Sequence, residues 1–337
     1  MRMNRFHLLL FTLFIPIIFG GGGVLFGLSI IGTGPLEQST SVLIAPGAGL
    51  VGTAAALKSA NVIRNEWLLE GLIIATGNKN KIKAGEYAFD AHASLWQVSQ
   101  KLARGEVLIR KVTFPEGWTS KQVVAALNQN EFLTGEIKDT PAEGSLMPDT
   151  YNFTRGQSRA AVLARMQKAM TDFIAANWPR HAADYPLTRP ADWVKLASIV
   201  EAETPKHDER ARVAGVYINR LQQNMLLEAD PTVIYGLSGG AGPLGRALIF
   251  DDLKTDTAFN TYLHAGLPPT PINNPGRASL LAALTPEAHH YLYFVADGTG
   301  GHAFAENFTE HQKNVAAWRK QKEQKEKAAE AASPHSP

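Results

Sequence analysis

The longest apolar segment of the chain lies at its N-terminus, and it constrains what the sequence can form. The segment from Leu8 to Ile31 contains no charged side chain, and Arg2 and Arg5 precede it. A run of this length can cross a bilayer as one helix, and basic residues before it favour a cytoplasmic N-terminus. A cleaved signal peptide would have a shorter apolar core and a small-residue cleavage site. The pattern predicts a cytoplasmic segment 1–7, a transmembrane helix 8–31 and a remainder outside the cytoplasm.

The composition excludes several classes of function. The chain is 45% hydrophobic and 19% charged, so it can bury a sizeable core in two or more domains. A formal net charge of +2 gives no reason to expect a nucleic-acid partner. The chain has no cysteine, which excludes disulfides, thiolate catalysis and Cys-based zinc sites. His289, His290, His302 and His311 lack metal-binding spacing, so we expect no metal and no cofactor.

The rest of the chain divides by its patterns. A Gly/Pro-containing linker at 32–40 is followed by three short β/α patterns in 41–142, which predict small α+β modules. The helix of the first pattern would carry Val51, Ala55 and Leu57 on its apolar face. A turn-rich segment then leads into a mainly helical region, 143–320, with helices expected at 160–178 and 192–204. The charged end, 321–337, has the composition of a solvated helix that frays into a tail.

Two acids stand at the end of the most apolar of these helices. Glu201 and Glu203 follow the run "LASIV", and Pro205 ends the helix just beyond them. A carboxyl at the end of a buried stripe is desolvated, so its pKa rises and it can hold a proton at neutral pH. Glu203 has the bulkier apolar neighbours and is the first candidate for a general acid. The alternative is a helix-terminal ion pair with Arg210 or Arg212.

Polar residues set among aromatic and proline-rich turns follow this helix. Such groups can hydrogen-bond sugar hydroxyl and acetamido groups, while aromatic rings stack on sugar faces. Each alone is more often a core or turn residue, and only their accumulation near a candidate acid indicates a saccharide cleft. The candidate substrate-binding residues are Asp230, Thr232, Tyr235, Asn260 and Tyr262.

A second motif suggests different chemistry. "GLSGG", Gly236 to Gly240, matches the nucleophile elbow of serine hydrolases and follows the strand-like "TVIY". An elbow requires a helix directly after the serine, whereas "AGPLGRA" here has the composition of a loop. A serine hydrolase acting through Ser238 therefore remains only an alternative.

The order of several long motifs resembles one known family. "EGSLMPDTY", "ASIVEAET", "VAGVYINRL", "DPTVIYGL", "NTYLHAGLPP" and "YLYFVADGTGGHAF" occur in the order found in the endolytic murein transglycosylases (MltG, YceG-like), over roughly residues 41–319. The middle of 41–142 also resembles a LysM module, which binds N-acetylglucosamine-containing glycans. Trp96 and Trp118 could stack on sugars there or belong to the core, and the module could equally be a spacer.

The resemblance implies an activity and a fold. Family members cleave the β-1,4 bond between N-acetylmuramic acid and N-acetylglucosamine without water, leave 1,6-anhydromuramoyl ends and are expected to terminate glycan elongation. It places the acid at Glu203, with Glu201 as fallback or supporting group. The implied fold class is α+β: a single N-terminal transmembrane helix, LysM-like modules and a mixed α/β catalytic domain.

The resemblance also implies partners and a location. The partners would be peptidoglycan strands and the penicillin-binding protein synthases, and the protein would be a single-pass protein of the bacterial inner membrane. Glu228, where the family pattern has Gln, would add a carboxylate near the site. The competing function from another class is a non-catalytic peptidoglycan-binding scaffold of the cell-wall synthesis machinery.

Overall fold

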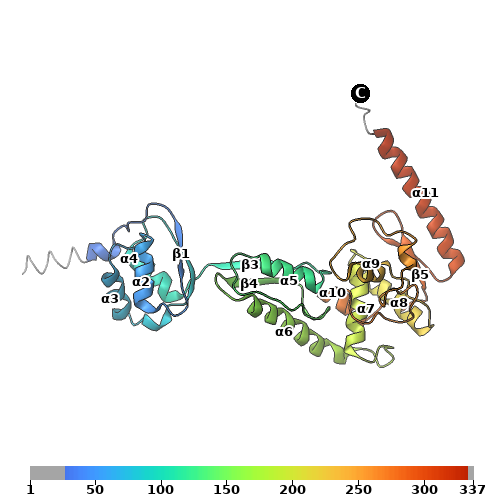
Figure 1. Ribbon diagram of the computed structural model, residues 1–337, viewed down its shortest axis with the longest axis horizontal. Helices are drawn as coiled ribbons and strands as arrows, with labels where there is room; N and C mark the ends of the chain where they lie inside the picture. Colours follow the sequence, from blue (N-terminus) through green and yellow to red (C-terminus); the bar gives the residue numbers. More distant parts are fainter. Residues whose placement is uncertain (1–26, 333–337) are drawn as a thin grey trace, which may run out of the picture. The chain divides into compact units, whose positions relative to one another are not determined.

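The computed structural model describes residues 27–332, which fold into two compact units (Figure 1). Unit 1 comprises residues up to Lys111 together with Asn152–Gln157, and unit 2 comprises Val112–Tyr151 and the chain from Ser158 onward. The division predicted at 142/143 lies within unit 2.

Unit 1 is a small α+β body built on one antiparallel strand pair. Its elements are β1 (Thr40–Ile44), α2 (Gly49–Ser59), α3 (Glu66–Ala75), the 3₁₀ turn η1 (Lys79–Lys81), β2 (Gly85–Phe89), α4 (Leu95–Arg104) and the start of β3 (Ile109–Thr113). β1 and β2 pair from Thr40 opposite Phe89 to Ile44 opposite Gly85. α4 begins at a capping box in which Ser94 and Gln97 satisfy each other's backbone N–H groups.

The apolar face predicted for α2 is wrong in part. Val51 is 69% exposed, whereas Leu50, Ala54 and Leu57 are buried. The helix starts at Gly49 after a tight turn, so its buried stripe lies about one residue earlier than the predicted one.

Unit 2 is mainly helical. Its elements are α5 (Ser120–Gln129), α6 (Arg159–Asn177) with the 3₁₀ turn η2 (Trp178–Arg180) that follows it, α7 (Pro190–Glu203), α8 (Arg210–Gln222), α9 (Asp230–Ser238), η3 (Asp252–Lys254), α10 (Arg277–Leu284), β5 (Tyr293–Ala296), β6 (His302–Ala305) and α11 (Phe308–Ala332). β5 and β6 form an antiparallel hairpin. β3 pairs with β4 (Thr150–Thr154), and the division between the units falls within both strands.

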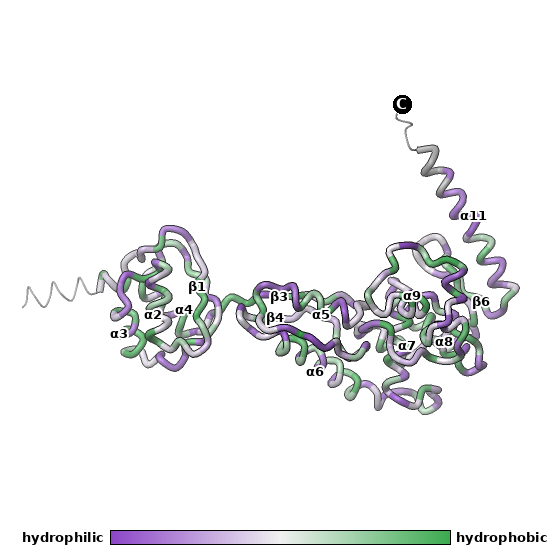
Figure 2. The backbone as a smooth tube through the Cα atoms, viewed as in Figure 1, coloured by the Kyte–Doolittle hydropathy of each residue, from purple (hydrophilic) through white to green (hydrophobic). Residues whose placement is uncertain are grey.

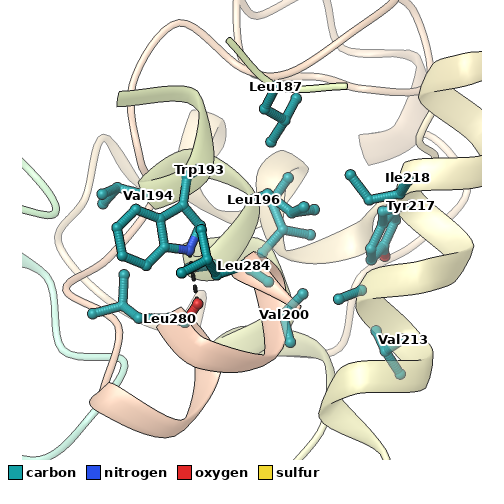
Figure 3. Close-up of a cluster of buried hydrophobic side chains, with 14 of the residues drawn as sticks. Leu187, Trp193, Val194, Leu196, Val200, Val213, Tyr217, Ile218, Leu280 and Leu284 are labelled. Atoms are coloured by element: carbon teal, nitrogen blue, oxygen red, sulfur yellow. Dashed lines mark hydrogen bonds between the residues drawn. The ribbon is translucent and has the colours of Figure 1, made fainter. Parts of the chain in front are cut away.

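The core of unit 2 surrounds α7. The middle of this helix is mostly apolar, and its residues from Trp193 to Val200 are all buried except the partly buried Lys195. α8 and α10 both pack on it. Figure 3 shows Trp193 donating its indole N–H to the Leu280 carbonyl of α10, at 2.7 Å. α7 ends at Glu203 because Thr204 is extended (φ −136°, ψ 124°), as the residue before a proline prefers to be.

A loop before α10 is fixed to the middle of α7 by Ser198. The Ser198 hydroxyl accepts the Ile272 N–H at 3.1 Å, and its carbonyl accepts the Asn273 amide at 2.8 Å. All three residues are buried. The loop therefore has a fixed position relative to the C-terminal half of α7, where Glu201 and Glu203 lie.

The predicted membrane topology is contradicted. Within residues 27–332 no helix is long and apolar enough to cross a bilayer. The longest described helices, α6 and α11, both carry charged side chains, which are costly in a bilayer centre. Residues 1–26, which include most of the predicted span 8–31, lie outside the described residues. The described residues therefore do not support the predicted single-pass architecture or the inner-membrane location inferred from it.

The charged C-terminal segment is helical where it is described. α11 continues to Ala332, and Figure 2 shows hydrophilic segments recurring along it. Residues 333–337 of the predicted tail lie outside the described residues.

Substitution of Gly215 tests the packing of α8. A Cβ at this position would lie 2.5 Å from the Glu287 carbonyl oxygen and 2.5 Å from His289 Nε2. We expect Gly215→Ala to destabilise unit 2 by about 1–3 kcal/mol, because the backbone at Glu287 must move. The control is Gly71→Ala. Gly71 occupies an exposed position of α3 with open space around it, so this substitution should stabilise unit 1 by about 0.5–1 kcal/mol. Scanning calorimetry would measure both; a stabilising Gly215→Ala would contradict the close approach.

Candidate active site

The carboxyl group of Glu203 lies at the C-terminal end of α7 in a desolvated environment. Tyr217 of α8, which is 2% exposed, donates its hydroxyl to Glu203 Oε1 at 2.7 Å. Figure 3 shows Tyr217 among the buried side chains on the α8 side of the core, and its ring lies edge-on to Phe294. Tyr217 is therefore fixed by packing, and its hydroxyl fixes the Glu203 carboxyl.

The pKa of Glu203 is raised to about 7. Desolvation is the main cause, and the nearby Asp230 carboxylate adds to it, whereas the Tyr217 hydrogen bond and the Arg220 guanidinium lower the pKa. The negative end of the α7 dipole also disfavours an anion at this position. A carboxyl with this pKa exists in both protonation states near neutral pH, so it can donate a proton and later accept one.

Glu201 has the opposite environment only two residues away. Its side chain is 6% exposed, and Oε1 lies 3.1 Å from a terminal nitrogen of Arg210, whose own side chain is 5% exposed. Its Oε2 accepts the Gly276 backbone N–H at 2.9 Å. Glu201 thus forms the helix-terminal ion pair considered as the alternative reading, and it connects α7 to the starts of α8 and α10.

Asp230 and Tyr262 lie close to Glu203. Tyr262 donates its hydroxyl to Asp230 Oδ1 at 2.7 Å. Burial raises the pKa of Tyr262 above its usual value, and the carboxylates of Asp230 and Glu203 raise it further. Asp230 is exposed, so it can contact a substrate. These two candidates therefore share one surface with the acid.

The side chains of Thr232 and Asn260 lie inside the protein. Both are 0% exposed. The Thr232 hydroxyl lies 2.9 Å from that of Thr261, and the Asn260 amide donates to two carbonyls of the η3 region, those of Leu253 and Thr255, at 2.9 Å each. They stabilise the turns that carry Asp230 and Tyr262.

Tyr235 lies on α9, with its ring against Phe259 at 4.7 Å and its hydroxyl 3.4 Å from Glu143 Oε1. Burial is the main reason that its pKa rises to about 12. It lines a cavity next to the site and is partly accessible.

Two polar neighbours of Glu203 were not singled out from the sequence. Tyr217 and Arg220 both lie in "VYINRL" on α8, and Arg220 is buried with its guanidinium donating to the carbonyls of Leu292, Leu226 and Leu227. Glu228 pairs with Arg220 at 2.9 Å. Their i, i+3 spacing on a helix was the available signal, because it puts a phenol and a cation on neighbouring positions of one face.

The serine motif is not a nucleophile elbow. "TVIY" is part of helix α9, not a strand, and Ser238 is the last residue of that helix, with its hydroxyl 3.4 Å from the Tyr235 carbonyl. Asp230 and Pro231 in the first turn favour helix over the strand tendency of Val233 and Ile234. Within residues 27–332 no group of three or more His, Asp or Glu side chains is arranged to hold a metal ion.

Comparison with known proteins assigns the chain to a family. A sequence model described as the YceG-like family matches residues 42–317. The chain belongs to this family. It is 28% identical over 326 residues to the endolytic murein transglycosylase of Bacillus subtilis, a match covering 87% of this chain and 89% of the relative. The family resemblance of the sequence motifs is thereby confirmed.

More distant matches agree. The endolytic murein transglycosylase of Streptococcus pneumoniae is 25% identical over 332 residues, and the match covers 83% of this chain but 58% of that longer protein. A crystal structure of a YceG-like protein from Listeria monocytogenes superposes with a TM-score of 0.50 at 28% identity. That match covers 82% of this chain and 99% of the other.

The different environments of the two acids predict opposite effects of amide substitution on stability. Because the pKa of Glu203 is raised in the folded state, the native protein binds more protons than the unfolded chain between about pH 4.5 and 7. Its folding stability therefore falls as the pH rises through this range. Glu203→Gln removes that loss, so the variant should gain about 1–3 kcal/mol relative to the wild type between pH 5 and 8.

Glu201→Gln serves as the matched control for this measurement. It leaves the buried Arg210 guanidinium without its nearest carboxylate, with only Glu116 at 3.7 Å remaining, so we expect a loss of about 3–5 kcal/mol. Denaturant unfolding at several pH values would measure both variants. A pH-independent loss of stability in Glu203→Gln would mean that its carboxyl is not desolvated.

Proposed function

We propose that the protein is an endolytic peptidoglycan lytic transglycosylase in which Glu203 serves as both acid and base. The observation that carries the proposal is a desolvated carboxyl with a pKa of about 7, fixed by Tyr217 and adjacent to an exposed Asp230. The relatives named endolytic murein transglycosylase support the same activity. The substrate would be the β-1,4 bond between N-acetylmuramic acid and N-acetylglucosamine in glycan strands.

The chemistry needs one proton to move twice. Protonated Glu203 donates to the glycosidic oxygen as the bond from the muramoyl anomeric carbon breaks, which releases the N-acetylglucosamine end with a new hydroxyl. The Glu203 carboxylate then accepts the proton of the muramoyl 6-hydroxyl, whose oxygen bonds to the anomeric carbon. The product is a 1,6-anhydro ring, no water is consumed, and the acid is restored. The Asp230 carboxylate, oriented by Tyr262, would stabilise the positive charge on the sugar ring.

We also propose a role for the reaction during the synthesis of new glycan strands. Internal cleavage of new strands would terminate their elongation, with the penicillin-binding protein synthases as partners. In unit 1, Trp96 is 43% exposed beside a cavity of about 360 Å³, which supports glycan binding by the LysM-like region over a pure spacer role.

Analysis of released muropeptides tests the reaction directly. We expect the wild-type protein to release fragments with 1,6-anhydromuramoyl ends from purified glycan strands, and Glu203→Gln to release none, as judged by mass spectrometry. Ser238→Ala is the control and should release the same products as the wild type. Reducing ends would indicate hydrolysis, and unchanged release by Glu203→Gln would exclude Glu203 as the acid. Binding of strands without any release would favour a scaffold.

The pH profile tests which groups tune the acid. The specificity constant kcat/KM should fall above about pH 7 as Glu203 loses its proton. Tyr217→Phe removes a hydrogen bond that lowers the pKa of Glu203, so the falling limb should move to higher pH. Asp230→Asn removes a charge that raises this pKa, so the limb should move to lower pH. Shifts of both variants in one direction would contradict the assignment.

A further inference from the structure

A cavity of about 430 Å³ lies beside the proposed acid and has no role in the chemistry above. Ala202 and Pro231 line it, and they are the chain neighbours of Glu203 and Asp230. The cavity therefore lies at the C-terminal end of α7 and the first turn of α9, the two segments that carry Glu203 and Asp230. All its lining residues belong to unit 2. A ligand bound in it would be continuous with one whose reacting bond lies at Glu203.

Two partly exposed aromatic side chains, Trp118 and Tyr235, form apolar parts of the wall. The backbone carbonyl of Trp118 accepts both the N–H and the side-chain amide of the buried Asn274, at 2.9 and 3.0 Å. Tyr235 is positioned by Phe259 and Glu143 as described above. Rigid aromatic groups of this kind bind sugar faces with little loss of conformational freedom.

A buried acceptor on the wall lacks a partner. Asn273 is 3% exposed and its amide nitrogen donates to the Ser198 carbonyl, which fixes its orientation. Its Oδ1 has no hydrogen-bond partner among the residues that the structure describes. An unsatisfied buried acceptor is costly and uncommon, so it indicates a missing donor. Gln122, whose Oε1 accepts the Thr119 N–H, leaves its amide nitrogen as a donor on the same cavity. One acceptor and one donor match the N–H and C=O of an acetamido group.

The charges around the cavity favour a neutral sugar. Arg246 lines it but forms two hydrogen bonds with Asp252, at 2.6 and 2.8 Å, so its charge is neutralised. Glu116 adds a carboxyl, only 3.7 Å from Arg210, which in turn lies closer to Glu201. The lactyl carboxylate of N-acetylmuramic acid would therefore meet no unpaired cation on this wall and would face Glu116.

We propose that this cavity is a subsite for an N-acetylglucosamine residue, with Trp118 and Tyr235 as its apolar walls and Asn273 as its hydrogen-bond acceptor. The inference rests on the proposed function for the glycan nature of the ligand. In this arrangement N-acetylglucosamine is the sugar of the repeating unit on the α9 side of Glu203, and Trp118, Tyr235 and Asn273 select it.

The test follows the indole signals of tryptophan by NMR in the full-length Glu203→Gln protein, which prevents turnover. N-acetylglucosamine and N-acetylmuramic acid form a matched pair, since they differ only in the lactyl ether. The Trp118 signal, assigned by its loss in Trp118→Phe, should shift saturably with N-acetylglucosamine. N-acetylmuramic acid should bind at least about threefold more weakly. An unmoved Trp118 signal, or equal binding of the two sugars, would overturn the proposal.

Substitutions then locate the contact. Asn273→Ala should weaken binding of N-acetylglucosamine roughly threefold to tenfold, the effect of one hydrogen bond. Should Asn273→Ala fail to fold, Tyr235→Leu gives the same test for the apolar wall. Trp67→Leu, at a 79% exposed position of α3 in unit 1, is the matched control and should leave the Trp118 titration unchanged. A Trp118 shift that survives both Asn273→Ala and Tyr235→Leu would place the sugar elsewhere.

The result of the NMR titration can be distinguished from the result of the muropeptide analysis. Anhydro-ended products from the wild type with no Trp118 shift in the NMR experiment would remove only the subsite. A specific Trp118 shift without products would retain the subsite and remove the lytic reaction.

Discussion

The middle of helix α7, from Trp193 to Val200, lies in the core of unit 2, and the elements that form the site are positioned by packing against it. Its apolar run allows α8 and α10 to contact it at once, and Ser198 fixes the loop that carries Asn273. A helix in this position cannot shift without disturbing the whole core of unit 2. The C-terminal carboxyls of α7 therefore have a precise position that a surface loop would not provide.

The end of α7 separates two identical side chains into two roles. Glu201 points to Arg210 and to the backbone of Gly276, where a charged carboxylate is required to satisfy a buried guanidinium. Glu203 points to Tyr217, where desolvation favours the protonated form. The ion pair connects α7, α8 and α10, and this stabilises the apolar environment that raises the pKa of Glu203. Glu201 thus has a structural role at the end of α7, next to the carboxyl proposed as the acid.

The sequence predicted the parts of this arrangement that depend on neighbours along the chain. The helix expected at 192–204 is α7, because a continuous apolar run and Pro205 define both its burial and its end. Glu203 was placed at a desolvated helix end for the same reason. The preference for Glu203 over Glu201 remains a prediction, but the different environments of the two carboxyls agree with it.

Features that depend on distant contacts were not predictable. Tyr217 reaches Glu203 only because α8 folds back along α7. Thr232 and Asn260 have the chemistry of sugar-binding groups, and only their hydrogen bonds to Thr261 and to the η3 region reveal them as scaffold. The face of α2 depended on where its helix begins, and the helix at Thr232–Tyr235 depended on Pro231 outweighing β-branched residues. The expected membrane span rested on a long uncharged apolar run and the basic residues before it.

A single carboxyl suits a reaction that consumes no water. Hydrolytic glycosidases divide the work between an acid and a second carboxylate that acts as base or nucleophile. When the attacking hydroxyl belongs to the substrate, the group that has just donated its proton can accept the next one. Such a group works best when its pKa lies near the ambient pH, since a stronger acid would be a poor base and a weaker acid a poor donor. Desolvation and Asp230 raise the pKa of Glu203, while Tyr217 and Arg220 limit the rise, and a pKa of about 7 would suit both halves of the proposed cycle.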